Sequence, residues 1–355
     1  MALPALSSIE ECADYSKTVE PFLPQLYDLP SRLLDSFSDR DALLQLYVET
    51  NPFISAAALS LFLACVFFVA AELNRNFSQV DRAWSILPAI YNAHFALWAR
   101  LSGGAHQRND LIAVSVAVWS LRLTLNYWRK GGYQKGSEDY RWAIIRKYVH
   151  PVIFSLFDLT FIAFIQNILI FLFSSAPSYI ILLASKFNPD IITSDLAFFG
   201  VEIALVIIEL VSDGQQWAFQ TAKHKYLRDA KLPHGFNQAD LDRGFITSGL
   251  WAYSRHPNFA AEQLIWFVLY QWGCYSTSTL YNWAGIGSGS LVLLFQGSTM
   301  LTEAISGGKY PEYRHYQKTV GKFLPTSLAP YRAPAETPKP SRPNHAAKRR
   351  QGKRD

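Results

Sequence analysis

Long runs of apolar residues are the feature that most restricts how this chain folds. About twenty consecutive apolar residues are needed to cross the hydrocarbon core of a bilayer as a helix. Seven runs approach this length, at residues 52–72, 84–101, 111–128, 152–173, 196–217, 259–275 and 282–304. Only 17% of the 355 residues are charged, whereas a soluble domain usually carries about a quarter. The sequence therefore predicts an all-α, polytopic membrane bundle of about seven transmembrane helices, and counts of six or eight fit the same pattern.

The polar parts of the chain lie mainly at its two ends. Residues 1–51 form a polar, acidic segment that lacks the order of basic, apolar and small residues found in a cleaved signal peptide. Residues 329–355 are rich in proline, lysine and arginine, and we expect a disordered basic tail there. The tail either contacts anionic lipid headgroups or only helps to set the topology. Residues 52–328 between these ends are expected to form one transmembrane domain.

The cysteines exclude some classes of site. Cys12, Cys65 and Cys274 are too few and too scattered for a disulfide framework or for zinc-ligand spacing. We therefore expect no metal site. The expected partners are the lipid bilayer and a lipid-soluble small molecule, and no nucleic acid.

Basic residues predict the orientation of the spans. The loops 129–150 and 218–258 each contain six lysines and arginines, whereas 174–195 contains only Lys186 and 276–281 contains none. Loops enriched in lysine and arginine face the cytosol. The sequence thus predicts an integral, multi-pass membrane protein with a cytosolic C-terminus and with its N-terminus on the opposite side.

Ionisable residues inside the apolar runs indicate a functional interior. Glu202, Glu209 and Asp213 recur at helical spacing, which places the last two within about 20° of the first on one helix face. Arg122 and Asn126 lie four residues apart and also share a face. Buried charges of this kind either serve function or form interhelical contacts. Arg122 requires an anionic partner, for which Glu209, Asp213 and a bound ligand are the candidates, and we count Arg122 among the predicted cofactor-binding residues.

Four motifs rich in polar and aromatic residues are predicted on the cytosolic side. They occupy residues 76–84, 131–142, 254–259 and 309–316. Arginine, histidine and asparagine side chains suit phosphates, and tyrosines such as Tyr310 and Tyr313 suit a flat ring. The motifs together predict a nucleotide pocket that includes His256, although His256 and the following Pro257 are also typical of a helix start. The chain has no Gly-x-Gly-x-x-Gly unit and no Walker loop, so the bundle itself would have to bind a dinucleotide.

These motifs resemble those of the steroid 5α-reductase-like membrane family, specifically of its DUF1295 branch. The resemblance rests on Asp81-Arg82-Ala83-Trp84, Glu138-Asp139-Tyr140-Arg141-Trp142, Ser254-Arg255-His256-Pro257-Asn258 with Glu262, and Lys309-Tyr310-Pro311-Glu312-Tyr313. It covers roughly residues 52–328. The Arg-His-Pro element followed by a glutamate is also similar to one in methyltransferases that bind S-adenosylmethionine, whereas the Asp81 and Glu138 motifs favour the reductases.

The resemblance implies a seven-helix bundle that binds NADPH at its cytosolic end, while a steroid or another enone lipid enters from the membrane. It implies that Asn258 and Glu262 bind the nicotinamide side of the cofactor. It also implies that Asp213, Arg243 and Arg255 bind the phosphates and the ribose. A location in the endoplasmic reticulum rests on the same likeness.

The resemblance also bears on the reacting groups. Arg122 matches the arginine that follows the catalytic tyrosine of the family by three residues, but Trp119 stands at the tyrosine position and has no proton to give up. Asp81 lies near the position of the glutamate that polarises the substrate carbonyl. Asp81 and Glu138 are therefore the predicted catalytic acids. Asp81 is equally suited to a structural ion pair with Arg82 or Arg122.

The expected function is an oxidoreductase that acts on CH–CH groups. In this hypothesis NADPH supplies a hydride to the β-carbon of a polarised double bond, and an acid near Asp81 stabilises or protonates the oxygen. Two alternatives remain open at this stage. One is transfer of a methyl group from S-adenosylmethionine to a membrane lipid or prenylated substrate, and the other is a lipid-binding protein without turnover.

Overall fold

The computed structural model describes residues 2–334, which form two compact units. The first unit comprises residues 2–214 and 257–304, and the second comprises residues 215–256 and 305–334. Helices make up the regular structure of the described residues, where the β pairing is limited to an isolated bridge between Ser254 and Gly321. The all-α fold is thus confirmed for this part of the chain. Most of the predicted basic tail, at 335–355, lies outside the described residues.

Within residues 2–334, three helical stretches are long and apolar enough to cross a membrane. They are α4 (Pro52–Asn74), α7 (Gln107–Arg129) and the stretch Pro151–Ala184. The last stretch consists of α9 (Pro151–Phe157), η3 (Asp158–Ile165), which is a π-helix, and α10 (Gln166–Ala184). The side chain of Asn51 accepts hydrogen bonds from the first backbone N–H groups of α4, which starts the first of these helices.

The other four predicted spans coincide with helices as well. These helices are α6 (Leu87–Leu101), α11 (Thr193–Asp229), α13 (Pro257–Ser276) and α14 (Gly285–Lys309). The 15 residues of α6 extend for only about 22 Å, less than the roughly 30 Å of a hydrocarbon core. The structure therefore supports three membrane-compatible helices, and the count of seven spans stays a prediction.

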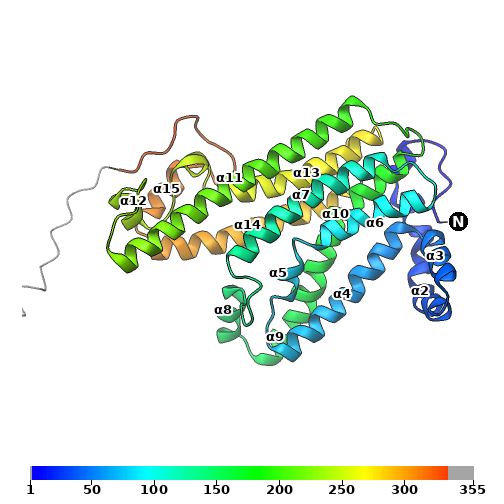
Figure 1. The fold of residues 1–355 in the computed structure, drawn as a ribbon, viewed down its shortest axis with the longest axis horizontal. Coiled ribbons are helices and arrows are strands. Elements are labelled where there is room, and N and C mark those ends of the chain that lie inside the picture. The colour runs from blue at the N-terminus through cyan, green and yellow to red at the C-terminus, as the bar shows by residue number, and fades with distance from the viewer. Residues whose placement is uncertain (1, 335–355) are drawn as a thin grey trace, which may run out of the picture. The chain divides into compact units, whose positions relative to one another are not determined.

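α10 differs from the expectation that residues 174–195 form an external loop. The helix continues to Ala184, and nearly all of its side chains are buried. It packs against α4, α6, α7 and α13 within the first unit (Figure 1). A helix that is enclosed by other helices can extend beyond the hydrocarbon core. The prediction assumed the usual length of a span and therefore placed the end of α10 too early.

The N-terminal polar segment is folded rather than extended. It forms η1 (Glu10–Ala13), α1 (Tyr15–Thr18), η2 (Glu20–Phe22), α2 (Leu23–Ser36) and α3 (Arg40–Glu49). The hydroxyl of Tyr179 in α10 donates a 2.7 Å hydrogen bond to the carbonyl of Thr18 and accepts a 2.8 Å bond from the Asn51 amide. These buried bonds attach the segment to the helices of the first unit.

Shorter helices lie between the long ones. The first unit contains α5 (Gln79–Ala83) and α8 (Tyr140–Tyr148), and the second contains α12 (Gln238–Arg243), η4 (Gly249–Ala252) and α15 (Tyr313–Thr319). The second unit has its own apolar core, which includes Phe245, Tyr316 and Tyr331. Tyr331 lies at the start of the predicted tail, yet its ring is buried and its backbone N–H donates to the carbonyl of Ala252.

Candidate functional site

The first unit contains a cavity of about 660 Å³ with a mainly apolar wall. This volume lies in the range of pockets for small organic ligands, which is roughly 300–1,000 Å³. Residues from α5, α7, α8, α13, α14 and the Pro151–Ala184 stretch line it. Its apolar and aromatic lining includes Trp84, Leu123, Tyr127, Trp142, Phe157, Phe161, Phe259, Leu293 and Leu301. The charged residues on its wall are Asp81, Asp139, Arg141 and Glu262.

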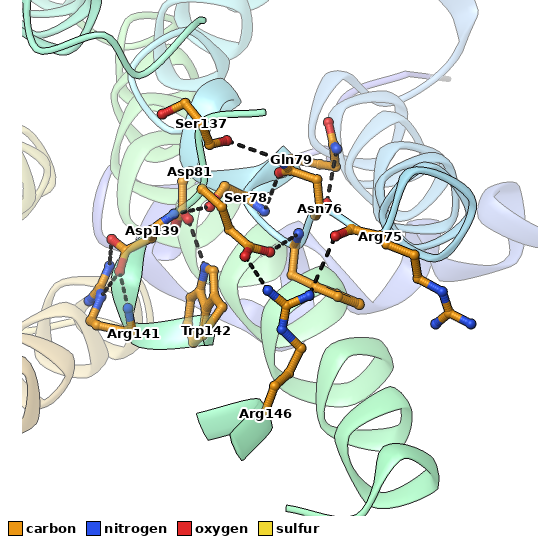
Figure 2. A network of polar contacts seen from close by, with 12 residues as sticks. Arg75, Asn76, Ser78, Gln79, Asp81, Ser137, Asp139, Arg141, Trp142 and Arg146 are labelled. Carbon is orange, nitrogen blue, oxygen red and sulfur yellow. Dashed lines mark hydrogen bonds and ion pairs between the residues drawn. The ribbon is translucent and has the colours of Figure 1, made fainter. Parts of the chain in front are cut away.

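Two of the sequence motifs bind each other beside this cavity. Figure 2 shows the segment from Arg75 to Asp81 against the segment from Ser137 to Arg146. The Asn76 amide donates to the carbonyl of Ser137 at 2.9 Å, and the backbone N–H of Asp139 donates to the hydroxyl of Ser78 at 2.9 Å. These bonds join segments about sixty residues apart, so the motifs form one structural element of the first unit.

Glu138, a predicted catalytic acid, joins these two segments. One carboxylate oxygen accepts a 2.9 Å hydrogen bond from the backbone N–H of Phe77. The other oxygen forms an ion pair with Arg146 (Figure 2). Glu138 is not among the residues that line the cavity. Its contacts indicate a structural role.

Asp81, the other predicted acid, lies on the cavity wall. Its Oδ2 accepts a 2.9 Å hydrogen bond from the indole N–H of Trp142 (Figure 2). Burial raises the pKa of Asp81, and this effect exceeds the lowering by hydrogen bonds from Trp142 and Ser78 and by the charge of Arg141. A carboxyl with a raised pKa keeps its proton at higher pH, so the half-buried Asp81 is suited to donate a hydrogen bond to a ligand oxygen.

Arg122 has the anionic partners that the sequence required. Its Nη1 lies 2.8 Å from Asp213 Oδ2, and its Nη2 lies 2.7 Å from Glu209 Oε1. Asp213 also accepts hydrogen bonds from the amides of Asn126 at 2.8 Å and Asn258 at 3.1 Å. All three charged side chains are at least nine-tenths buried. Arg122 and Asp213, both predicted to bind cofactor, thus form a buried ion pair in the first unit, in which Nε and Nη2 of Arg122 have no hydrogen-bond partner.

Glu262 is held on the cavity wall by two tryptophans. One carboxylate oxygen accepts a 2.8 Å hydrogen bond from the indole N–H of Trp119, and the other accepts a 2.9 Å bond from Trp266. Arg122 Nη2 lies 3.8 Å from the same carboxylate. Trp119, which stands where the resembling family has a tyrosine, therefore orients Glu262. The contact between Glu262 and Trp266 was predictable from the sequence, because the two residues lie four positions apart on one helix face. The contact with Trp119 was not.

Asn258 retains one unsatisfied group. Its amide nitrogen donates to Asp213, whereas its buried amide oxygen has no hydrogen-bond partner. Buried polar groups are seldom left without a partner. The oxygen of Asn258 is therefore an unmet hydrogen-bond acceptor in the interior of the first unit.

The remaining predicted cofactor residues lie in the second unit, where most of their polar groups contact protein. Arg243 pairs with Asp240 at 2.7 Å and with Glu312 at 3.2 Å. Arg255 donates to the carbonyls of Gln317 and Val320. These bonds engage the two arginines that were expected to bind phosphates.

Three further residues of the second unit complete the predicted set. The backbone N–H of His256 donates to the carbonyl of Lys322 at 3.0 Å, and the buried ring of Tyr313 packs in the core of this unit. The hydroxyl of Tyr310 accepts a 2.8 Å hydrogen bond from Lys223. Burial alone would raise the pKa of Tyr310, but its contacts with Lys223 and Lys309 outweigh that effect and lower it.

Comparison with known sequences decides the family. Residues 67–320 match the family described as "Protein of unknown function (DUF1295)". The chain belongs to the DUF1295 family. It is also similar to an uncharacterised protein of the fission yeast Schizosaccharomyces pombe, with 38% identity over 329 residues, which cover 91% of this chain and 93% of that protein. No solved structure matches the chain.

The DUF1295 match extends over both catalytic predictions and all nine cofactor predictions. It begins within α4 and ends at residue 320, directly after α15. It includes parts of both compact units. The cavity and the buried arginine cluster of this DUF1295 protein therefore lie within the region that defines its family.

Proposed function

We propose that this DUF1295 protein is a membrane-embedded reductase of a carbon–carbon double bond in a steroid-like or other enone lipid, with NADPH as the hydride donor. The proposal places it beside the steroid 5α-reductases. The observation that carries it is the carboxyl of Asp81, whose pKa is raised by burial, on the wall of a mainly apolar cavity. Such a cavity suits a lipid with few polar atoms, and a protonated carboxyl suits its carbonyl oxygen.

The residues of the chain would act on the substrate as follows. Apolar side chains from α7 and α14 bind the hydrocarbon part of the lipid and exclude water. The protonated carboxyl of Asp81 donates a hydrogen bond to the substrate oxygen, where negative charge develops during reduction, and then transfers its proton to that oxygen. Trp142 donates to the other side of the same carboxyl and orients it. When bound, NADPH supplies the hydride that adds to the β-carbon.

The residues of the chain fit the nicotinamide ring of NADPH better than they fit its phosphates. The unpartnered amide oxygen of Asn258 can accept a hydrogen bond from the carboxamide of a nicotinamide ring. The cavity wall suits phosphates poorly, because three of its four charged residues are acidic and its one arginine, Arg141, is paired with Asp139. Arg243 and Arg255 would have to exchange protein partners for phosphate oxygens. The proposed role of Asp81 does not depend on where these phosphates bind.

Cofactor identity tests the proposal directly. The purified full-length protein in detergent is titrated with NADPH, NADP and S-adenosylmethionine while its thermal unfolding is followed. A cofactor that binds only the folded protein at a hundred times its Kd stabilises it by about 2.7 kcal/mol, so NADPH is expected to raise the unfolding temperature. Stabilisation by S-adenosylmethionine alone would indicate a methyltransferase, and stabilisation by lipid without either cofactor would indicate a lipid-binding protein. Both outcomes contradict the proposal.

We also propose seven spans, with the C-terminus in the cytosol and a location in the endoplasmic reticulum. The basic loops and the helices that coincide with all seven apolar runs support this topology. A protease-cleavable tag after Asp355 should be removed from the cytosolic side of sealed membranes, whereas one before Met1 should be protected. Cleavage of both tags from the same side would require an even number of spans.

A further inference from the structure

Helix α2 of the N-terminal segment exposes a row of large apolar side chains. Tyr27, Leu34 and Phe37 are 82%, 79% and 80% exposed, and Leu23 and Pro30 of the same helix are exposed as well. These five positions recur at steps of four, three, four and three residues, so they form one apolar stripe along the helix. Single apolar residues on a surface are ordinary, whereas a contiguous apolar surface marks a site of interaction.

The other faces of α2 have different surroundings. On one side of the stripe, roughly 90° around the helix, Leu29 is buried and Leu26 is half-buried, so this face packs against the protein. On the other side, centred roughly 110° from the stripe, Asp28, Ser31 and Asp35 are exposed. An acidic face of this kind belongs in water. The apolar stripe lies between the protein and the acidic face, as in a helix at a boundary between an apolar medium and water.

Contacts within the first unit place α2 at the level where α4 begins. The side-chain oxygen of Gln25 accepts a 2.8 Å hydrogen bond from the backbone N–H of Asn51, the residue that caps α4, and Arg32 pairs with Glu49 at 3.3 Å. Figure 1 shows α2 and α3 beside this end of α4. The 23 residues of α4 extend for about 34 Å, little more than a hydrocarbon core of roughly 30 Å. The start of α4, and α2 with it, therefore lies close to the boundary between hydrocarbon and water.

We propose that α2 is an interfacial helix, which lies in the plane of the membrane and inserts its apolar stripe into the phospholipid leaflet where α4 begins. Its 14 residues extend for only about 21 Å and include Asp28 and Asp35, so α2 does not span the membrane itself. With the stripe between the headgroups and the upper acyl chains, the acidic face remains in water. The N-terminal segment, which is polar in overall composition, thus forms a second attachment to lipid beside the spanning helices.

The size and the position of the stripe favour lipid over another protein. A stable protein–protein interface contains about 20 residues on each side, whereas the stripe consists of five side chains. α4, which α2 contacts, presents exposed apolar side chains such as Phe62 and Val69 along its length, as expected of a helix in contact with lipid. The stripe extends this lipid-facing surface to the edge of the same bilayer.

Spin labels on the two exposed faces of α2 test this proposal. Nitroxide labels are attached one at a time at Tyr27→Cys and Leu34→Cys on the stripe, and at the matched controls Asp28→Cys and Asp35→Cys on the acidic face. The full-length protein is placed in phosphatidylcholine nanodiscs. Power-saturation EPR then measures how often each label collides with oxygen, which concentrates in lipid, and with nickel–EDDA, which stays in water. We expect the ratio of oxygen to nickel collisions to be several-fold higher for the stripe labels than for the controls.

Cys65→Ser is the background for all four labelled variants, because Cys65 is exposed whereas Cys12 and Cys274 are buried. Equal nickel collision rates on the two faces would place the stripe in water and overturn the proposed insertion. Stripe labels that are shielded from both reagents, with spin–spin broadening that disappears on mixing with unlabelled protein, would place a second copy of the chain on the stripe and overturn it as well. Two positions on each face keep the comparison valid if one variant fails to fold.

Discussion

Asp81→Asn is expected to reduce turnover of the best enone lipid by roughly a hundredfold to ten-thousandfold, or about 3–5 kcal/mol of barrier. The amide has nearly the shape of the carboxyl and can still hydrogen-bond, but it cannot supply an acidic proton. Cofactor binding and the unfolding temperature should change little, because an amide oxygen can accept the hydrogen bonds that Trp142 and Ser78 donate to this carboxyl. The measurement is kcat for a panel of enone lipids together with thermal unfolding of each variant.

Glu138→Gln is the control for this experiment. Glu138 belongs to the neighbouring motif and its carboxylate bridges Phe77 and Arg146, away from the cavity wall. We expect it to lower stability while leaving kcat within a few-fold of the parent. If Asp81→Asn remains folded and turns over at the parental rate, Asp81 is a structural residue and the proposed chemistry is wrong.

The raised pKa of Asp81 gives the same residue a pH signature. The folded protein binds this proton more tightly than the unfolded chain does, because burial disfavours the charged form. Its contribution to stability is therefore complete below the unfolded pKa of aspartic acid and is lost as the pH rises through the higher folded pKa. Because the proposed turnover depends on protonated Asp81, kcat should fall as the pH rises through the same range. Asp81→Asn should remove both trends, as measured by unfolding and rate profiles against pH.

Arg122→Met is expected to destabilise the first unit by about 3–5 kcal/mol, since it leaves buried carboxylates without their cation. Glu209 and Asp213 lie 2.7 and 2.8 Å from the guanidinium, and Glu262 lies 3.8 Å away. Without Arg122 these acids must bind protons or repel one another in a poorly solvated interior. The measurement is the free energy of unfolding or, where unfolding is irreversible, the rate of thermal inactivation.

Arg129→Met provides the comparison on the same face of α7. Arg129 is exposed at the end of the helix, where it donates to the side chain of Asn126 and to the carbonyl of Asp213. Its loss should cost much less than that of Arg122. Adding Glu209→Gln to Arg122→Met should restore part of the lost stability, because it removes one unpaired charge. Equal effects of the two arginine variants would show that Arg122 is not the cation that holds this cluster.

Local patterns in the sequence were sufficient to predict the long apolar helices, although not the end of α10 and not the shorter helices. Hydropathy is a property of neighbouring residues, and each of the seven apolar runs coincides with a helix in the structure. The requirement of Arg122 for an anion was also predictable, since a buried guanidinium needs one wherever it lies. Spacing alone further predicted that Glu209 and Asp213 share a face, and both contact Arg122.

Only the tertiary structure decided which distant groups meet. Trp119 and Glu262 are 143 residues apart, and the two partners of Glu138 lie 61 and 8 residues from it. Whether such groups touch depends on the rotation and depth of each helix against its neighbours, and a hydropathy pattern contains neither quantity. The position of Gln166 beside the cavity was unpredictable for the same reason, because nothing local distinguishes a glutamine that packs in a core from one that borders a cavity.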